Sequence, residues 1–281
     1  PYWIARPELH DLPTCGPGGP AAINKKPDME AILQARPQVI FVTYMDGGLA
    51  DEVQAALNIP VVALSYGDLG RFDPAVYDSL RIAGRVLNRS DRAEAVVDFI
   101  RSLIRDLKDR TRNIPEDQRP RAFVGGIGYR GAHGIESTES DYLPLNGIHA
   151  VNLADQVAAR IGTHVFVDKE ILLSLDPEVI FIDGGGMDLV TEDFRKKPAF
   201  YRTLTAFKTG RVYTLLPFNF YTTNLGTALA DAYAAGKILY PDRFADLDPE
   251  EKADEIYRFL DGRCTTPWPG PMVPSAARRR F

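Results

Sequence analysis

The segment that decides the fold is DMEAILQARPQVIF, residues 28–41. Its first half carries apolar side chains at helical spacing, then come Pro37 and a continuous apolar run that begins at Val39. That order predicts a short helix ended by the proline, and then a strand buried on both faces, as strands of parallel sheets are. A second helix over residues 49–57 and a second apolar run over 60–64 repeat the rhythm. The sequence therefore predicts an α/β fold with parallel sheets.

The same pattern returns as DKEILLSLDPEVIF, residues 168–181, which aligns with the first segment without a gap. An acid opens both segments, a proline follows both helices, and both segments end in Val-Ile-Phe. A short helix, a proline and a buried strand are common enough that such a match can be accidental. The shared acid and the shared proline favour an internal repeat, and hence two Rossmann-like lobes of similar build.

A long helix is expected between the two segments. Residues 91–112 contain neither Gly nor Pro, and one helical face is apolar: Val96, Val97, Ile100, Leu103, Ile104 and Leu107. Such a helix spans roughly 30 Å, enough to bridge two lobes. We expect a first lobe over residues 1–90, a connecting helix over 91–114, and a second lobe with a C-terminal tail over 115–281.

The second lobe is expected to hold further strands and helices. The apolar pattern predicts strands over 121–126, 179–182 and 211–215 and helices over 151–161, 169–175, 198–207, 224–239 and 249–260. A long polar loop is expected from the first of these strands to residue 146.

Composition excludes several functional classes. The net charge is −5, which argues against nucleic-acid binding, since phosphate recognition needs clustered positive charge. No apolar run approaches the roughly 20 residues of a membrane span. The chain opens at Pro1 without an apolar leader, as a processed exported protein or a truncated sequence would. Cys15 and Cys264 form no CxxC pair; they are two free thiols or, in an oxidising compartment, one disulfide.

Polar and glycine-rich segments follow the predicted strands, at residues 43–48 and 183–188. In open α/β sheets ligands bind beyond the carboxyl ends of the strands, so we expect these segments to border a cleft between the lobes. The triple glycine at 184–186 either presents backbone N–H groups to an anion or is a plain turn.

Residues 126–131, GIGYRG, fit the dinucleotide-binding pattern G-x-G-x-x-G after a strand. That pattern must open a helix, yet a further glycine-containing loop follows here, and no clear strand-end acid lies at the required distance. A plain turn is one alternative. We favour a ligand loop, in which Arg130 offers a planar fork for anionic oxygens.

We expect seven side chains at the cleft, each after a predicted strand end: Tyr44, Tyr66, Tyr129, Arg130, His133, Asn219 and Tyr221. The aromatic segment 217–224 is either a cleft wall or a core-packing loop. The four histidines lack the spacing of a helical zinc pair, and no G-x-S-x-G is present, so we expect neither a metal site nor an enzyme, and no cofactor.

Residues 28–41 resemble the signature helix and strand of the ABC solute-binding proteins that serve ferric siderophores, haem and vitamin B12. Two later segments, GAHGIEST at 131–138 and NFYTTN at 219–224, resemble the branch of that class described as binding iron or metal chelates. A molybdate or tungstate binder is similar to that branch too. The class normally has a strand and a helix before the point that corresponds to Tyr2, so ligand residues of that part cannot be named.

The resemblance implies a monomeric periplasmic or extracellular receptor, soluble or lipid-anchored, with two lobes, one connecting helix and a ligand cleft between the lobes. It implies delivery of an iron-siderophore or similar metal chelate to the dimeric permease of an ABC importer. Glu30 and Glu170 would dock on arginines of that permease. Two alternatives stay open: a molybdate or tungstate receptor of the same fold and, from another class, a dinucleotide-dependent α/β oxidoreductase that uses the loop at Gly126.

Overall fold

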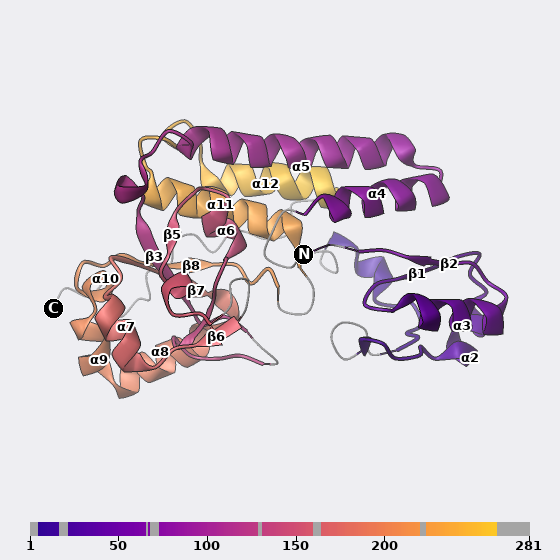
Figure 1. Ribbon diagram of the computed structural model, residues 1–281, viewed down its shortest axis with the longest axis horizontal. Helices are drawn as coiled ribbons and strands as arrows, with labels where there is room; N and C mark the ends of the chain where they lie inside the picture. Colours follow the sequence, from indigo (N-terminus) through magenta and orange to yellow (C-terminus); the bar gives the residue numbers. More distant parts are fainter. Residues whose placement is uncertain are drawn as a thin grey trace. The chain divides into compact units, whose positions relative to one another are not determined.

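The computed structural model describes residues 5–16, 22–65, 67, 73–128, 131–159, 164–219 and 223–262 (Figure 1). The chain divides into two compact units, residues 1–99 and 100–281, and the division falls inside helix α5 (Ser90–Thr111). Each unit has its own parallel sheet. The predicted α/β class with parallel sheets is confirmed.

The first unit is built on two parallel strands, β1 (Ile40–Val42) and β2 (Val61–Ala63), with Ile40 opposite Val61. Around them lie η1 (Pro7–Leu9), α2 (Met29–Ala35), α3 (Gly47–Leu57) and α4 (Pro74–Val86). Ile32, Val53 and Leu57 form the buried core between α2, α3 and the strands. The segment that decided the fold therefore forms a helix and a strand, as predicted, but the strand is only partly buried rather than buried on both faces, because its sheet has just two strands.

The two repeated segments end their helices in the same way. Arg36 after α2 and Asp176 after α7 (Lys169–Leu175) both adopt left-handed backbone, with φ of 49° and 35°. In each case a proline follows, which cannot continue a helix. The beginnings differ: Asp28 accepts a hydrogen bond from the Ala31 backbone N–H at 3.0 Å, whereas Asp168 makes no side-chain capping bond.

The second unit has a four-stranded parallel sheet in the order β5–β3–β7–β8. Its strands are β3 (Arg121–Gly125), β5 (Val151–Asn152), β7 (Val179–Asp183) and β8 (Val212–Leu215). A separate antiparallel pair joins β4 (Ser137–Glu139) to β6 (His164–Phe166). The remaining elements are η3 (Glu116–Gln118), α6 (Leu143–Asn146), η4 (Leu153–Gln156), α7, η5 (Gly184–Gly186), α8 (Met187–Lys196), α9 (Pro198–Thr203), α10 (Thr205–Lys208), α11 (Leu225–Leu239) and α12 (Pro249–Asp261).

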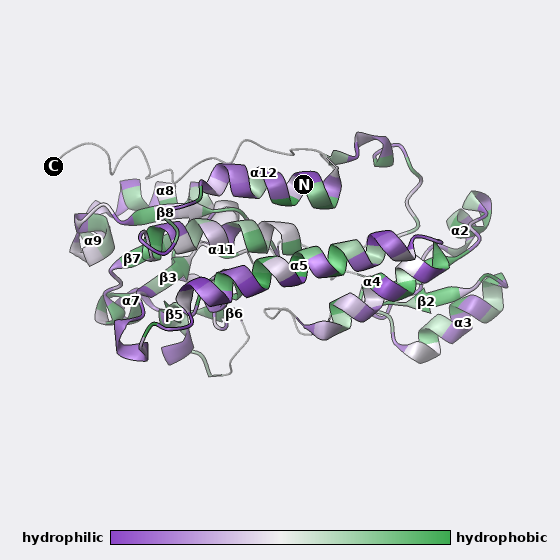
Figure 2. Cartoon of the chain, turned by 90° about the horizontal axis from the view of Figure 1, so that it is seen from above, coloured by the Kyte–Doolittle hydropathy of each residue, from purple (hydrophilic) through white to green (hydrophobic). Residues whose placement is uncertain are grey.

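Two long helices, α5 and α11, differ in how much of their surface is buried. α11 is buried on nearly every side and packs against α6 and α12. α5 buries one stripe, which includes Val97, Ile100, Leu103 and Leu107. Figure 2 shows hydrophilic and hydrophobic residues alternating along α5. The apolar face predicted for this helix is confirmed.

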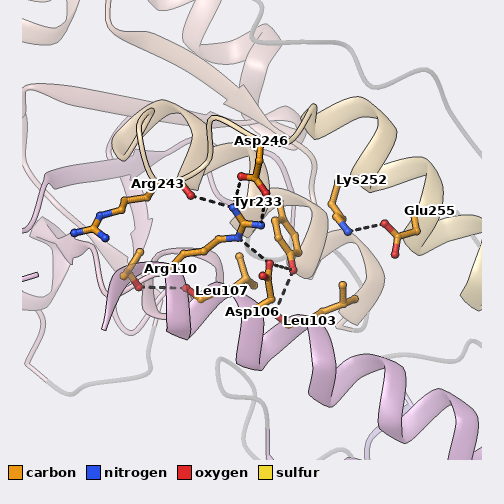
Figure 3. A network of polar contacts seen from close by, with 10 residues as sticks. Leu103, Asp106, Leu107, Arg110, Tyr233, Arg243, Asp246, Lys252 and Glu255 are labelled. Atoms are coloured by element: carbon orange, nitrogen blue, oxygen red, sulfur yellow. Dashed lines mark hydrogen bonds and ion pairs between the residues drawn. The ribbon is translucent and has the colours of Figure 1, made fainter. Parts of the chain in front are cut away.

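A polar network fastens the end of α5 within the second unit (Figure 3). The Arg110 guanidinium donates hydrogen bonds to Asp246 at 2.6 Å, to the Arg243 carbonyl at 2.9 Å and to Asp106 at 2.9 Å. The Tyr233 hydroxyl of α11 donates to the same Asp106 carboxylate at 2.8 Å. The Arg110 hydrogen bond also holds the pKa of Asp246 down, to about 2. α5, α11 and the segment before α12 are thereby linked.

Several sequence predictions for residues 127–207 were wrong. The helix expected over residues 151–161 is not found in the described part, residues 151–159: β5 pairs with β3 there, and η4 follows it. The expected polar loop contains β4 and α6, and β6 was not predicted. Residues 198–207 form two helices, because Leu204 between them has extended backbone with ψ of 132°. These elements are short or polar, so apolar periodicity carries little signal for them.

Cys15 is an exposed free thiol, and Cys264 lies outside the described residues. Within the part of the chain that the structure describes, no helix combines the length and apolarity needed to cross a bilayer.

Candidate functional site

The carboxyl edge of the first sheet holds Tyr44, the first predicted site residue. Tyr44 follows β1 in left-handed backbone, with φ of 58°. Its position is braced because its carbonyl accepts from the Asn24 N–H at 3.0 Å, while the Asn24 side chain accepts from the Asp46 N–H at 3.0 Å. Burial raises the pKa of the Tyr44 hydroxyl, so this group stays protonated.

A pocket of about 570 Å³ lies at this edge, within the first unit. Its walls combine apolar side chains, polar side chains and one acid: Ile23, Asn24, Tyr44, Met45, Asp46, Ala63, Leu64, Ser65 and Gly67. It lies beyond the carboxyl ends of two neighbouring parallel strands, where open α/β sheets bind ligands. Tyr66, also predicted here, lies outside the described residues.

In the second unit the two predicted glycine segments meet. A Cβ atom added to Gly186 would lie 2.3 Å from the Gly126 carbonyl oxygen and 2.5 Å from that of His133. Such an approach requires glycine, since real Cβ atoms are excluded at these distances. Gly126 itself has φ of 79° and donates its N–H to the Gly134 carbonyl at 3.1 Å. The loop after β3 and the turn after β7 therefore form one edge, which we call the glycine edge (residues 126–128, 131–134 and 184–186).

This loop does not open a helix. Gly126 bonds back to Gly134, and the next element in the described chain is the strand β4. The backbone geometry of a dinucleotide-binding turn, in which the glycine loop leads into a helix N-terminus, is absent from residues 126–128 and 131–139. The described part of this loop therefore does not support the oxidoreductase alternative.

His133 lies at the glycine edge beside a second histidine that sequence reasoning missed. The ring centroids of His133 and His164 are 6.3 Å apart, and both rings contact Phe166 edge-on. His164 Nε2 lies 2.7 Å from the Ser137 hydroxyl, which itself donates to the Ile127 carbonyl. Because the Ser137 hydroxyl hydrogen is used in that bond, His164 Nε2 donates to the Ser137 oxygen. Burial, and then the charge of His133, lower the pKa of His164 to about 4, so its ring is neutral at pH 7.

Asn219 follows β8 and is held by an acid that was not predicted. Its side-chain amide donates to Glu139 at 2.9 Å, at the end of β4. Burial raises the pKa of Glu139, while this hydrogen bond lowers it. No sequence signal pointed to Glu139, because the strand that carries it has no apolar alternation. Tyr129, Arg130 and Tyr221 lie outside the described residues.

The two glutamates predicted to dock on a permease lie in equivalent positions. Glu30 and Glu170 are exposed in the first turns of α2 and α7. Among the described residues neither has an ion-pair or hydrogen-bond partner. No group of three or more His, Cys, Asp or Glu side chains in the described ranges converges as metal ligands would.

Residues 23–217, more than half of the chain, match the family described as periplasmic binding protein. The chain belongs to that family. Periplasmic binding proteins are the solute-binding components of ABC transporters, not enzymes, and the two α/β units agree with this membership.

Individual relatives span almost the whole of this periplasmic binding protein. The molybdate-binding protein MolA of Haemophilus influenzae is 25% identical over 92% of this chain and 74% of its own length. Its molybdate-bound structure matches with a TM-score of 0.71 at 21% identity, over 95% of this chain and 83% of that one. A periplasmic solute-binding protein of Veillonella parvula matches with 0.70 at 18% identity, over 92% and 75%. Nickel-bound CeuE of Helicobacter pylori matches with 0.60 at 14%, over 91% and 77%.

Proposed function

We propose that this periplasmic binding protein captures a metal-bearing anion and delivers it to the permease of an ABC importer. The ligand that we favour is a tetrahedral oxyanion, molybdate or tungstate. One observation carries that choice: the sequence relationship with MolA, a molybdate-binding protein, extends over 92% of the chain. The periplasmic location belongs to the family, and a lipid anchor is a further part of the proposal.

The glycine edge has chemistry that suits an oxyanion. Backbone N–H groups of closely packed glycine turns form concave sites for anions without any side chain. His133 lies at this edge with a polar ring, and Arg130 precedes it in sequence by three residues. A guanidinium would supply the charged, fork-like donor that an oxyanion needs.

The second candidate is a metal chelate such as an iron-siderophore, and the first unit favours it. The pocket beside Tyr44 is about 570 Å³, which is larger than a bare tetrahedral oxyanion requires. Its walls include Tyr44, Met45 and Leu64, side chains that suit the organic part of a chelate.

Native mass spectrometry of protein purified from its source separates these candidates. A molybdate or tungstate adduct supports the first, and an iron-chelate mass supports the second. Calorimetric titration of the ligand-free protein with sodium molybdate and with ferric chelates then ranks their affinities. A bound nicotinamide or flavin dinucleotide, with neither kind of metal-bearing ligand, would overturn the proposed function.

A further inference from the structure

Three carboxyl groups lie buried directly behind the loops at the carboxyl edge of the second sheet. Asp183 is 4% exposed at the end of β7, and Asp231 of α11 is 0% exposed. Glu139, at the end of β4, is part-buried as a residue, and its carboxyl lies inward against Asn219. None of the three pairs with a lysine or arginine of the described residues.

Each carboxyl holds one segment of that edge. Asp183 accepts from the Gly185 N–H at 2.8 Å and so fixes the turn η5. Asp231 accepts from the Leu216 N–H at 3.0 Å, directly after β8. Glu139 accepts from the Asn219 amide at 2.9 Å. A change of charge in this group therefore acts on the loops where we expect the ligand.

Two polar atoms inside the cluster have no partner. The second carboxyl oxygen of Asp231 and the hydroxyl of Tyr142 are buried without a hydrogen bond. Tyr142 is 1% exposed and packs against Phe218 with ring centroids 5.3 Å apart. It interacts electrostatically with all three acids, so its hydroxyl belongs to the same cluster. A buried carboxylate oxygen without a donor is costly unless the carboxyl binds a proton or a cation.

The surroundings of the buried carboxyls favour a bound proton over a bound cation. Within the described residues the acids do not converge as metal ligands would. Among the described residues, Asp141 acts electrostatically on Glu139, and His164 lies opposite Glu139 in the β4–β6 pairing. Asp141 adds negative charge, and His164 is neutral at pH 7, so neither compensates the acids.

We propose that Asp183, Asp231 and Glu139, with the Tyr142 hydroxyl, form a proton-binding site in the second unit, and that an anion bound at the glycine edge draws a further proton into it from solvent. The proton-binding site does not depend on the identity of the ligand. The coupling to a bound anion rests on the proposed function. A neighbouring negative charge favours the neutral form of a carboxyl, so anion binding and proton uptake support each other.

The pKa directions of these groups agree with this assignment. Burial raises the pKa of Asp183 to about 7, against the opposing effect of the Gly185 hydrogen bond. Burial, together with the charge of Asp183, raises the pKa of Asp231 well above its usual range. Both directions favour the protonated form of the carboxyl, and the pKa of Asp183 lies close enough to neutral pH for this group to gain or lose a proton there.

Carboxyl carbon NMR of the ligand-free, full-length protein tests the proton site without any ligand. We expect the Asp183 resonance to titrate near neutral pH and the Asp231 resonance to stay in its protonated position there. The variants Asp183→Asn and Asp231→Asn assign the two resonances. The isosteric Asp188→Asn, which removes an exposed acid of α8, should change neither. Titration of both carboxyls within the ordinary range, about pH 3 to 5, would overturn the proton site.

Calorimetry with sodium molybdate at pH 7, in buffers of different ionisation enthalpy, tests the coupling. We expect uptake of about half a proton per bound anion, since a carboxyl that titrates near pH 7 is half protonated before binding, and little uptake in Asp183→Asn. Equal uptake in wild type and Asp183→Asn, or none in either, would overturn the coupling. Absence of molybdate binding would overturn the coupling and the favoured ligand together, while the NMR titration decides the proton site separately.

Discussion

Burial and hydrogen bonding act on the Asp183 carboxyl in opposite directions. Burial raises its pKa, and the Gly185 N–H lowers it; burial prevails, and the pKa is about 7. An aspartate whose folded-state pKa exceeds its unfolded value binds its proton more tightly when folded. Its contribution to stability is therefore most favourable at low pH and declines as the pH rises from about 4 to about 7.

Asp183→Asn should remove this dependence, because the amide cannot ionise and still accepts from Gly185. We expect an unchanged free energy of unfolding near pH 4 and an increase on the order of 2–4 kcal/mol at pH 8, since each pKa unit is worth about 1.4 kcal/mol. Urea unfolding at both pH values measures it, with Asp188→Asn as the control. An equal loss of stability at pH 4 and pH 8 would contradict a raised folded-state pKa of Asp183.

Gly186 has no room for a side chain. A methyl group there would overlap the carbonyls of Gly126 and His133, so Gly186→Ala should cost about 1–3 kcal/mol of stability and weaken ligand binding by moving the glycine edge. The matched control is Gly47→Ala at the start of α3, where no atom lies within 4 Å of the added Cβ. That variant should be neutral or slightly stabilising. Thermal unfolding compares the two, and similar losses would refute the steric explanation.

Arg130 is predicted to bind the anion directly. Arg130→Ala should weaken an anionic ligand by about 1.5–3 kcal/mol, the range of a charged hydrogen bond. Arg112→Ala, which removes an exposed arginine paired only with Asp109, serves as the control. Isothermal titration measures both. Unchanged affinity in Arg130→Ala would remove this residue from the site.

At the scale of elements, the sequence predicted helices and strands with strong apolar periodicity and missed those without it. α5 and α11 were found because their apolar faces are long, and β1 and β7 because they are continuous apolar runs. β4 reads Ser-Thr-Glu, and its first two residues are buried through tertiary packing rather than hydrophobicity. His164 and Glu139 were missed for that reason: both belong to the β4–β6 pair.

The attachment of α5 to the segment before α12 depends on Arg110, whose side chain is 18% exposed and donates to Asp106, Asp246 and the Arg243 carbonyl. Arg110→Met keeps the packing and removes these hydrogen bonds, so it should destabilise the protein by about 2–4 kcal/mol. Arg112→Met removes an exposed ion pair with Asp109 just after the helix ends, and it should change stability by less than about 1 kcal/mol. Chemical denaturation measures both. Similar values would show that the network of Figure 3 adds no stability.

At the scale of the whole molecule, the repeat that relates the two lobes also relates two exposed acids. Asp28 already caps α2, so Glu30 is not needed for that purpose. A purely structural role for an acid in the first turn is compensation of the helix dipole, which contributes about 0.3–1 kcal/mol to stability. A partner with two equivalent halves could instead bind both acids at once, and rim ion pairs of this kind mainly set orientation and association rate.

The double variant Glu30→Ala with Glu170→Ala tests docking in a reconstituted importer. We expect ligand affinity to hold while transport and stimulation of ATP hydrolysis fall. Glu178→Ala removes an exposed acid that directly precedes β7. This control should leave transport and the stimulation of ATP hydrolysis unchanged. Normal transport by the double variant would leave only the helix-dipole role.

The division between the two units has a practical consequence for dissecting the receptor. It falls between Phe99 and Ile100, inside an uninterrupted helix whose residues Val97, Ile100 and Leu103 are all buried. A fragment cut there would begin in mid-helix, with freshly exposed N–H groups and a severed apolar stripe. An isolated half-receptor should therefore start at Ser90 and carry the helix whole, and a protease probing the native protein should cut in other segments first.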